Sequence, residues 1–161
     1  MIRAATEADI PGILPVWNAL IRDTTVTFAE VEKTPGELAG LLRDKAEAGL
    51  PFLVAEAEGA ILGFASFGPF RSGSGYRQSF EHSLCLVPAA WGRGLGRALM
   101  ARIEAAARAA GGHVLVAGVS GENAAGIAFH TALGFVETGR MPEVGFKFGR
   151  RLDLVLMQKR L

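Results

Sequence analysis

Hydrophobic residues recur at helical spacing in two stretches of the first fifty positions. A short apolar segment at 2–5 precedes Thr6-Glu-Ala-Asp9, which resembles a capping box and predicts a helix start. Thr34-Pro-Gly-Glu37 opens a second stretch, with proline at the first helical position, and that stretch stops near 49–51. The pattern predicts a strand followed by two amphipathic helices. Their inward-facing residues are expected to be Ile10, Ile13, Leu14 and Trp17 in the first, and Leu38, Leu41 and Leu42 in the second.

Short apolar runs and turn residues alternate in the rest of the chain. The runs predicted to be strands are 52–57, 61–67, 78–87, 113–119, 136–141 and 152–158. Glu58-Gly-Ala60 joins the first two as a hairpin, which argues against a doubly wound sheet. Two further helices are predicted, one from the glycines after Pro88 to about Ala110 and one over 124–133. This order predicts a single α/β (α+β) domain over 1–161, with one central mixed sheet flanked by helices.

Composition and charge exclude several classes of protein. The formal net charge of the 161 residues is +1 and no basic block is present, which speaks against a nucleic-acid partner. No apolar run approaches the roughly 20 residues of a membrane span, and the start MIRAATEAD lacks the apolar core of a signal peptide. Cys85 is the only cysteine, which argues for a reducing compartment, and no His/Cys/Asp spacing predicts a metal site. We expect a cytoplasmic protein without a membrane or nucleic-acid partner.

Glycines dominate the segment between an apolar run and a helix-forming run at 84–100, LCLVPAAWGRGLGRALM. Gly92, Gly94 and Gly96 alternate there with larger residues. Because glycine has no Cβ, successive backbone N–H groups can turn toward one point, and a helix N-terminus adds unpaired donors and partial positive charge. The segment therefore predicts a phosphate-binding junction. A glycine-rich turn without a ligand is the alternative.

Two phosphate-binding motifs fit this junction poorly. A P-loop requires Lys and then Ser or Thr after its last glycine, whereas Arg97 and Ala98 follow Gly96. A dinucleotide fingerprint requires a third small residue, and that position holds Arg97 or Leu99, depending on the glycine that starts the motif. It also requires an acidic residue about 20 positions further on, and none is there.

A third motif fits better, because the chain resembles the GNAT acyltransferases. Their acetyl-CoA junction is Gln/Arg-x-x-Gly-x-Gly/Ala after a strand, and Gly94-Leu-Gly96 matches it with Trp91 in the Gln/Arg position. Residues 123–135, an Asn-led helix ending in Gly-Phe, are similar to the family's second CoA segment. Phe80-Glu-His-Ser83 and Val144-Gly-Phe-Lys-Phe-Gly149 resemble the phosphinothricin and methionine-sulfoximine N-acetyltransferases within that family.

The resemblance implies a GNAT fold, with a mostly antiparallel sheet that a bulge splays at an acetyl-CoA cleft. Acetyl-CoA would be the co-substrate, and no metal is implied. Backbone groups of one strand would bind the pantetheine arm, and the junction's amides the pyrophosphate. A lone cysteine with apolar neighbours is expected in the core, which argues against an acetyl-cysteine intermediate. The residues expected to bind acetyl-CoA are Leu84, Cys85, Leu86, Gly92, Arg93, Gly94, Leu95, Gly96, Arg97 and Asn123.

Two residues match catalytic positions of these relatives. Glu81 matches the proposed base that takes a proton from the acceptor ammonium. A glutamate at the rim, or one in a salt bridge with Arg77, is the alternative. His130 stands where many GNATs have a tyrosine that protonates the departing thiolate, and its near-neutral pKa suits an acid–base role. A histidine packed between Phe129 and Leu133 is the alternative.

The implied acceptor is a small anionic amino-acid analogue of the phosphinothricin or methionine sulfoximine/sulfone type, acetylated on its amino group by direct attack. Arg71 would bind its carboxylate or phosphinate, and His82 should point away from Glu81. The expected acceptor-binding residues are Phe28, Arg71, Ser72, Gly73, Glu81, His82, Ser83 and Lys147. A polyamine or protein N-terminus as acceptor, and a CoA-binding regulatory module without chemistry, are the alternative functions. The resemblance also implies a homodimer.

Overall fold

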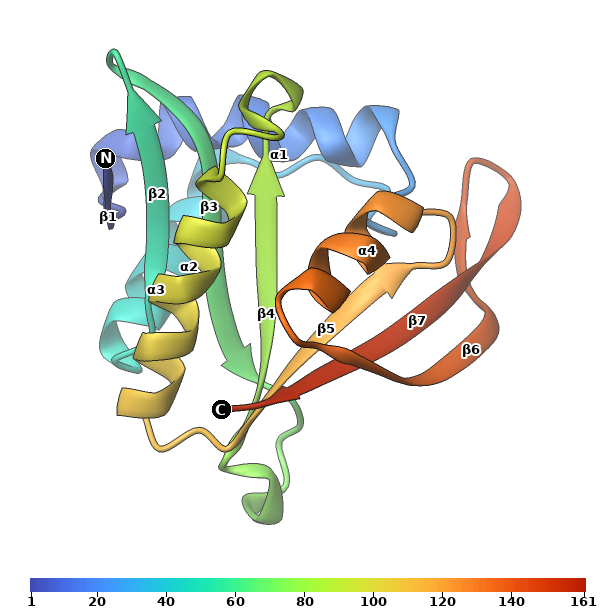
Figure 1. Cartoon of the computed structure of the whole chain (residues 1–161). Helices are drawn as coiled ribbons and strands as arrows, with labels where there is room; N and C mark the ends of the chain where they lie inside the picture. Colours follow the sequence, from blue (N-terminus) through green and yellow to red (C-terminus); the bar gives the residue numbers. More distant parts are fainter.

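The computed structural model describes all 161 residues as one central sheet with helices on both faces (Figure 1). Its seven strands have the order β1-β2-β3-β4-β5-β7-β6, and β4 and β5 are the only parallel neighbours. The strands are β1 (Ile2–Ala4), β2 (Phe52–Ala57), β3 (Ala60–Pro69), β4 (Ser79–Leu86), β5 (Val114–Ser120), β6 (Val136–Lys147) and β7 (Arg150–Arg160). The predicted mixed, mostly antiparallel sheet is confirmed.

All four predicted helices are present, and each pair of helices covers one face of the sheet. They are α1 (Ile10–Asp23), α2 (Pro35–Glu47), α3 (Leu95–Ala109) and α4 (Ala124–Ala132). Residues of α1 and α2 pack with Phe52 and Phe64 in one core cluster, whereas α3 packs with Phe67, Phe80 and Phe135 in the other. The sheet therefore separates two cores. None of the helices combines the length and the hydropathy of a membrane-spanning segment.

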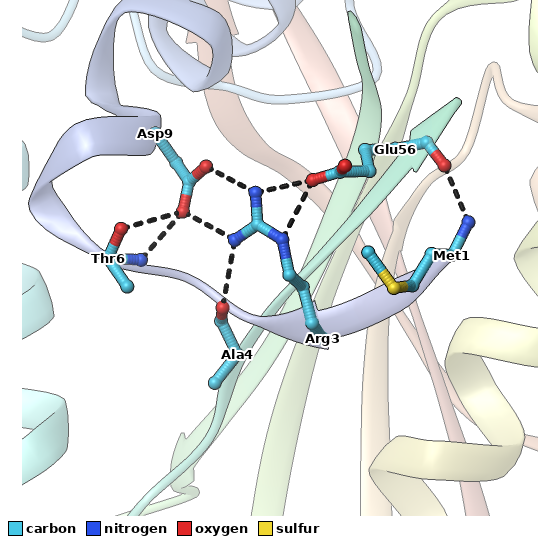
Figure 2. A network of polar contacts seen from close by, with 6 residues as sticks. All are labelled: Met1, Arg3, Ala4, Thr6, Asp9 and Glu56. Atoms are coloured by element: carbon cyan, nitrogen blue, oxygen red, sulfur yellow. Dashed lines mark hydrogen bonds and ion pairs between the residues drawn. The ribbon is translucent and has the colours of Figure 1, made fainter. Parts of the chain in front are cut away.

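Arg3 ties the first strand to its neighbours (Figure 2). Its guanidinium donates to both carboxylate oxygens of Asp9, at 2.8 and 2.7 Å, and to Oε2 of Glu56 at 2.7 Å. Asp9 also accepts the backbone N–H of Thr6 at 2.7 Å, as the predicted capping box requires. The hydrogen bonds from Arg3 lower the pKa of Asp9 to about 2. This network fixes the start of α1 against β1 and β2.

The C-terminal hairpin is longer than the sequence pattern predicts. The predicted strands at 136–141 and 152–158 extend to Val136–Lys147 and Arg150–Arg160 and form one hairpin. The pairing shifts register between Met141 and Gly145, and Glu143 has a positive φ of 57° there. A bulge of this kind interrupts the alternation of polar and apolar residues, which hides the strand from a periodicity argument.

Candidate functional site

The central strands β4 and β5 separate along most of their length (Figure 1). They pair only from Ser79 to Glu81 on β4. Beyond that point β4 stays paired with β3 as far as Leu86, and all of β5 stays paired with β7, so each strand follows its own antiparallel partner. The β3–β4 register is continuous, so the expected bulge is absent from that pairing. The opening leaves the backbone of Leu84, Cys85 and Leu86 without a strand partner on the β5 side.

The glycine junction forms the N-terminus of α3 at the wide end of this opening. Gly92 and Gly94 have positive φ values of 70° and 78°, which explains why glycine is required at both. The backbone N–H groups of residues 92–97 donate to no group of the chain, and Arg93 and Arg97 are exposed beside them. A run of free donors at a helix N-terminus fits a phosphate group. The predicted junction therefore has the geometry that binding of a pyrophosphate needs.

Two other glycines of the cofactor segments are required for close packing. Gly96 is buried, and a Cβ there would lie 3.2 Å from both Leu86 and Phe129. Asn123 caps α4 by accepting the backbone N–H of Gly126 at 2.9 Å, and a Cβ on Gly126 would overlap the Asn123 amide at 2.3 Å. Cap formation uses the Asn123 oxygen and leaves its amide N–H groups free to donate.

Glu81 lies where the pairing of β4 with β5 ends. A Cβ on Gly118 of β5 would be 3.1 Å from Oε1 of Glu81, so the carboxylate extends across the start of the opening. The residue keeps solvent access, but partial burial of the carboxylate raises its pKa, and the positive charge of Arg71 opposes that rise. Arg77 donates to the Ser74 carbonyl at 3.3 Å, so the alternative Glu81–Arg77 salt bridge does not form.

Glu81 and Ser83 line a cavity of about 210 Å³ on the face of the sheet that α1 and α2 cover. Its remaining walls are Trp17, Leu41, Lys45, Phe52, Phe64, Ser66, Phe67 and Gly68. A larger cavity of about 610 Å³ lies between α1 and the β2–β3 hairpin, and its only guanidinium, on Arg3, is already paired with Asp9 and Glu56. Of these two cavities, the smaller is the one lined by the predicted base, Glu81.

The loop after β3 brings a guanidinium near Glu81. Arg71 is exposed, its guanidinium lies 5.2 Å from the centre of the Phe70 ring, and its charge acts on Glu81. Ser72 and Gly73 follow it on the exposed part of the loop. Arg71 forms no ion pair with any carboxylate of the chain, so its guanidinium is free to bind an anionic ligand.

His82 and His130 form a buried pair on the opposite face of β4. Each is 8% exposed, and their Nε2 atoms are 3.1 Å apart. Nδ1 of His130 lies 2.7 Å from the carbonyl oxygen of Gly126 on α4, whereas Nδ1 of His82 has no partner. Burial lowers the pKa of both rings. The prediction that His82 points away from Glu81 is confirmed, and His82 does not line the small cavity that Glu81 lines.

These contacts assign the protons of the neutral pair. A carbonyl only accepts, so His130 must carry its proton on Nδ1 and use Nε2 as an acceptor. His82 must then donate from its own Nε2, which leaves its Nδ1 as a buried acceptor. Neutral His130 therefore has no free N–H for a thiolate. Its predicted acid role requires the ring to leave His82 or the pair to bind a further proton.

The segment between α1 and α2 is held against β6 by two predicted residues. The Phe28 ring packs against Gly145, where a Cβ would lie 2.5 Å from it. Lys147 is 1% exposed and donates from Nζ to the carbonyls of Thr24 and Thr27 at 2.6 and 2.8 Å. Its ammonium supports the loop and is not on the open surface, which differs from the acceptor-binding position expected for it.

The sulfur chemistry of Cys85 agrees with the expectation of a core residue. Its side chain packs against the cluster under α1 and α2, and burial raises the pKa of its thiol to about 12. A thiol with so high a pKa is a poor nucleophile.

One residue beside the site has no counterpart among the predicted residues. Lys45 of α2 lines the cavity, and its only sequence signal was a basic position in the last turn of a helix, which is common at helix C-termini.

Trp91, at the position where the family has Gln or Arg, donates weakly from Nε1 to the Leu86 carbonyl at 3.4 Å.

Comparison with known proteins agrees with this geometry. The acetyltransferase (GNAT) family matches residues 16–135. An L-methionine sulfoximine/L-methionine sulfone acetyltransferase from Salmonella typhimurium is 41% identical over 160 residues, which cover 99% of this chain and 94% of the relative.

Two solved structures have the same fold. A ribosomal-protein-alanine N-acetyltransferase from Brucella melitensis is 43% identical with a TM-score of 0.96, and 100% of this chain and 99% of that chain are covered. A phosphinothricin acetyltransferase from Sinorhizobium meliloti, in complex with acetyl-CoA, is 34% identical with a TM-score of 0.94. That match covers 100% of this chain and 88% of the other chain. The open β4–β5 edge, the free amides at α3 and these matches agree, and the chain belongs to the GNAT acetyltransferase family.

Proposed function

We propose that the protein transfers the acetyl group of acetyl-CoA to the amino group of a small amino-acid analogue of the methionine sulfoximine, methionine sulfone or phosphinothricin type. The observation that carries this proposal is the position of Glu81, which faces the small cavity at the point where β4 and β5 separate. Relatives named for these acceptors match 98% or more of the chain.

The residues of this chain fit distinct roles in that reaction. The amides of 92–97 would bind the pyrophosphate, and the unpaired β4 edge at Leu84–Leu86 the pantetheine arm. Acetyl-CoA supplies the thioester. Glu81 accepts a proton from the acceptor ammonium, because only the free amine has a lone pair to attack with, and its raised pKa favours this transfer. Arg71 orients the acceptor's α-carboxylate beside Glu81.

The direct test is thiol release from acetyl-CoA with L-methionine sulfoximine, L-methionine sulfone and L-phosphinothricin as acceptors. Turnover of at least one of the three, which is lost when the acceptor's amino group is blocked, is expected. A peptide with N-terminal alanine and a polyamine are the competing acceptors. Efficient turnover of either, with none of the amino-acid analogues, would replace the proposal.

A protein N-terminus is the second candidate acceptor, because the Brucella melitensis structure carries that name. The small volume of the cavity and the position of the free Arg71 guanidinium favour an acidic small molecule. A CoA-binding module without chemistry is disfavoured by a carboxylate that lines the cavity and makes no hydrogen bond or ion pair of its own.

We also propose that two copies associate through β6, the edge strand of the sheet. Large apolar side chains are exposed on this strand and its turn. They are Val136, Met141, Val144, Phe146 and Phe148. An exposed apolar edge strand is an association surface unless something covers it. The free thiol of Cys85 fits a reducing compartment, and we propose the cytoplasm.

A further inference from the structure

Lys45 lies on the face of α2 that packs toward the sheet, and its ammonium has no carboxylate partner. None of the ion pairs of the chain includes it, and Nζ has one hydrogen bond, to the carbonyl of Phe67 at 2.5 Å. The residue is half-buried, and burial lowers the pKa of its ammonium. An ammonium has three N–H donors, so donors remain for another acceptor. A partly buried cation without a counter-charge is a place where an anionic ligand gains binding energy.

The position of Lys45 relates it to Glu81. A Cβ on Gly68 would lie 3.1 Å from Nζ of Lys45, so the ammonium stands over Gly68. Gly68 is the cross-strand partner of Glu81, and all three residues line the 210 Å³ cavity. Glu81 turns its carboxylate the other way, toward Gly118 on β5. The cavity is therefore lined by a base and by a cation whose ammonium stands over the residue paired with that base.

Aromatic and aliphatic side chains form half of the cavity lining, and its polar members besides Lys45 and Glu81 are Ser66 and Ser83. Trp17, Phe52 and Phe64 form an aromatic cluster, with ring centroids 4.8 Å apart for Trp17 and Phe64 and 5.2 Å apart for Phe52 and Phe64. Such walls suit methylene groups and not a second charge. At about 210 Å³ the cavity is smaller than the roughly 300–1,000 Å³ of drug-sized ligand pockets, so it fits one short side chain.

We propose that Lys45 binds an acidic group at the far end of the acceptor's side chain. The inference rests on the proposed function and deepens it. The acceptor's amine lies at Glu81 and its α-carboxylate at Arg71, whose charge acts on Glu81. The side chain then extends from Glu81 toward Gly68, beside the aromatic residues, and ends at the Lys45 ammonium that stands over Gly68. This site prefers acceptors with a terminal anion, such as a phosphinate or carboxylate, over neutral analogues of the same length.

The test compares two acceptors that differ at that end, L-phosphinothricin with a phosphinate anion and L-methionine sulfone with a neutral sulfone. Steady-state kcat and KM are measured for both with the intact protein and with Lys45→Met, Lys45→Arg and Arg43→Met. Arg43 lies on the same helix, is exposed and pairs with Glu7, so it controls for loss of a charge from α2. Lys45→Arg retains the charge and a donor for the Phe67 carbonyl, and keeps the test usable if Lys45→Met unfolds.

We expect Lys45→Met to raise the KM for phosphinothricin about tenfold or more, as loss of a charged hydrogen bond does, with a much smaller change for methionine sulfone. Lys45→Arg should retain most of the preference for the anion. Equal changes for both acceptors, or none, would overturn the proposal and assign Lys45 to support of the Phe67 carbonyl alone. If the intact protein acetylates neither of these acceptors nor L-methionine sulfoximine, the proposed function fails. Calorimetry of phosphinothricin with the CoA-loaded protein then decides the inference, and equal binding to Lys45→Met, or no binding to the intact protein, overturns it.

Discussion

Glu81 and His82 are neighbours on β4, yet the structure places them in opposite electrostatic environments. The Glu81 face has a solvent-accessible glutamate and a half-buried lysine that line a small cavity, and the charge of the exposed Arg71 acts on the Glu81 carboxylate. The His82 face is closed, and two stacked rings with an interplanar angle of 26° pack against Phe129 and Phe135. Burial raises the pKa of the carboxyl on one face and lowers the pKa of the imidazoles on the other.

The difference shows which face can exchange protons during turnover. Both shifts favour the neutral form, as burial always does. Glu81 keeps solvent access and no fixed hydrogen bond, so it can take up a proton and release it. His82 donates its proton to Nε2 of His130, and His130 donates its own to the carbonyl of Gly126. Nδ1 of His82 is buried and has no partner. The Glu81 face therefore fits a reacting centre, and the His82 face fits a support for the strand that carries it.

The largest effect is expected from Glu81→Gln. This change keeps the shape of the side chain and removes its basicity, so kcat should fall about 10²- to 10⁴-fold, the usual contribution of a positioned base. The affinity for acetyl-CoA should be retained, because its predicted contacts lie at the β4 edge and at 92–97. Steady-state kinetics and calorimetry with CoA measure the two quantities.

The pH profile supplies the internal control for that variant. With Glu81 as base, the rate of the intact protein should fall as the pH drops below the raised pKa of this carboxyl, and the Gln variant should lose that acid limb. An unchanged acid limb in Glu81→Gln would assign the base to another group.

The two faces also differ in how far the sequence predicts them. A charged residue within an apolar strand marks Glu81, and alternation along the strand correctly puts His82 on the other side. The His82–His130 contact joins residues 48 positions apart, and no local pattern encodes it. Lys45 is hidden for the same reason, since its relation to Glu81 exists only after α2 packs over β3. Glycine spacing predicts the turn at Gly92 and Gly94, whereas the packing role of Gly96 depends on Phe129 of a later helix.

A smaller effect, on stability and not on chemistry, is expected from His82→Phe. The native pair resists protonation while unfolded histidines bind protons below their ordinary pKa of about 6.5. Each depressed histidine therefore contributes stability above that pH, and the contribution is lost as the pH falls, by up to about 1.4 kcal/mol per pH unit. The free energy of unfolding of the variant, measured by denaturant titration, should depend less steeply on pH between 6 and 4 than that of the intact protein.

His113→Phe is the matched control for that experiment, because His113 is the remaining histidine and is exposed. An acid dependence as steep in His82→Phe as in the intact protein would mean that the buried pair carries a proton in the native state. Nitrogen-15 spectra of the imidazoles test the same point directly, and we expect the proton of His130 on Nδ1 and that of His82 on Nε2.

The smallest effect is expected from Arg71→Ala. This variant distinguishes the role of Arg71 from that of Arg77, the other arginine of the same loop. Loss of the charge that opposes the burial of Glu81 should raise the carboxyl pKa further, so the acid limb of the rate should move to higher pH. The KM for the amino-acid acceptor should rise about tenfold with loss of a charged hydrogen bond. Arg77→Ala is the control, because Arg77 donates only to the Ser74 carbonyl and touches neither Glu81 nor the cavity. Equal shifts of the acid limb in both variants would show that the loop as a whole, and not Arg71, opposes the rise in the pKa of Glu81. The contrast between the two faces of β4 would then rest on burial alone.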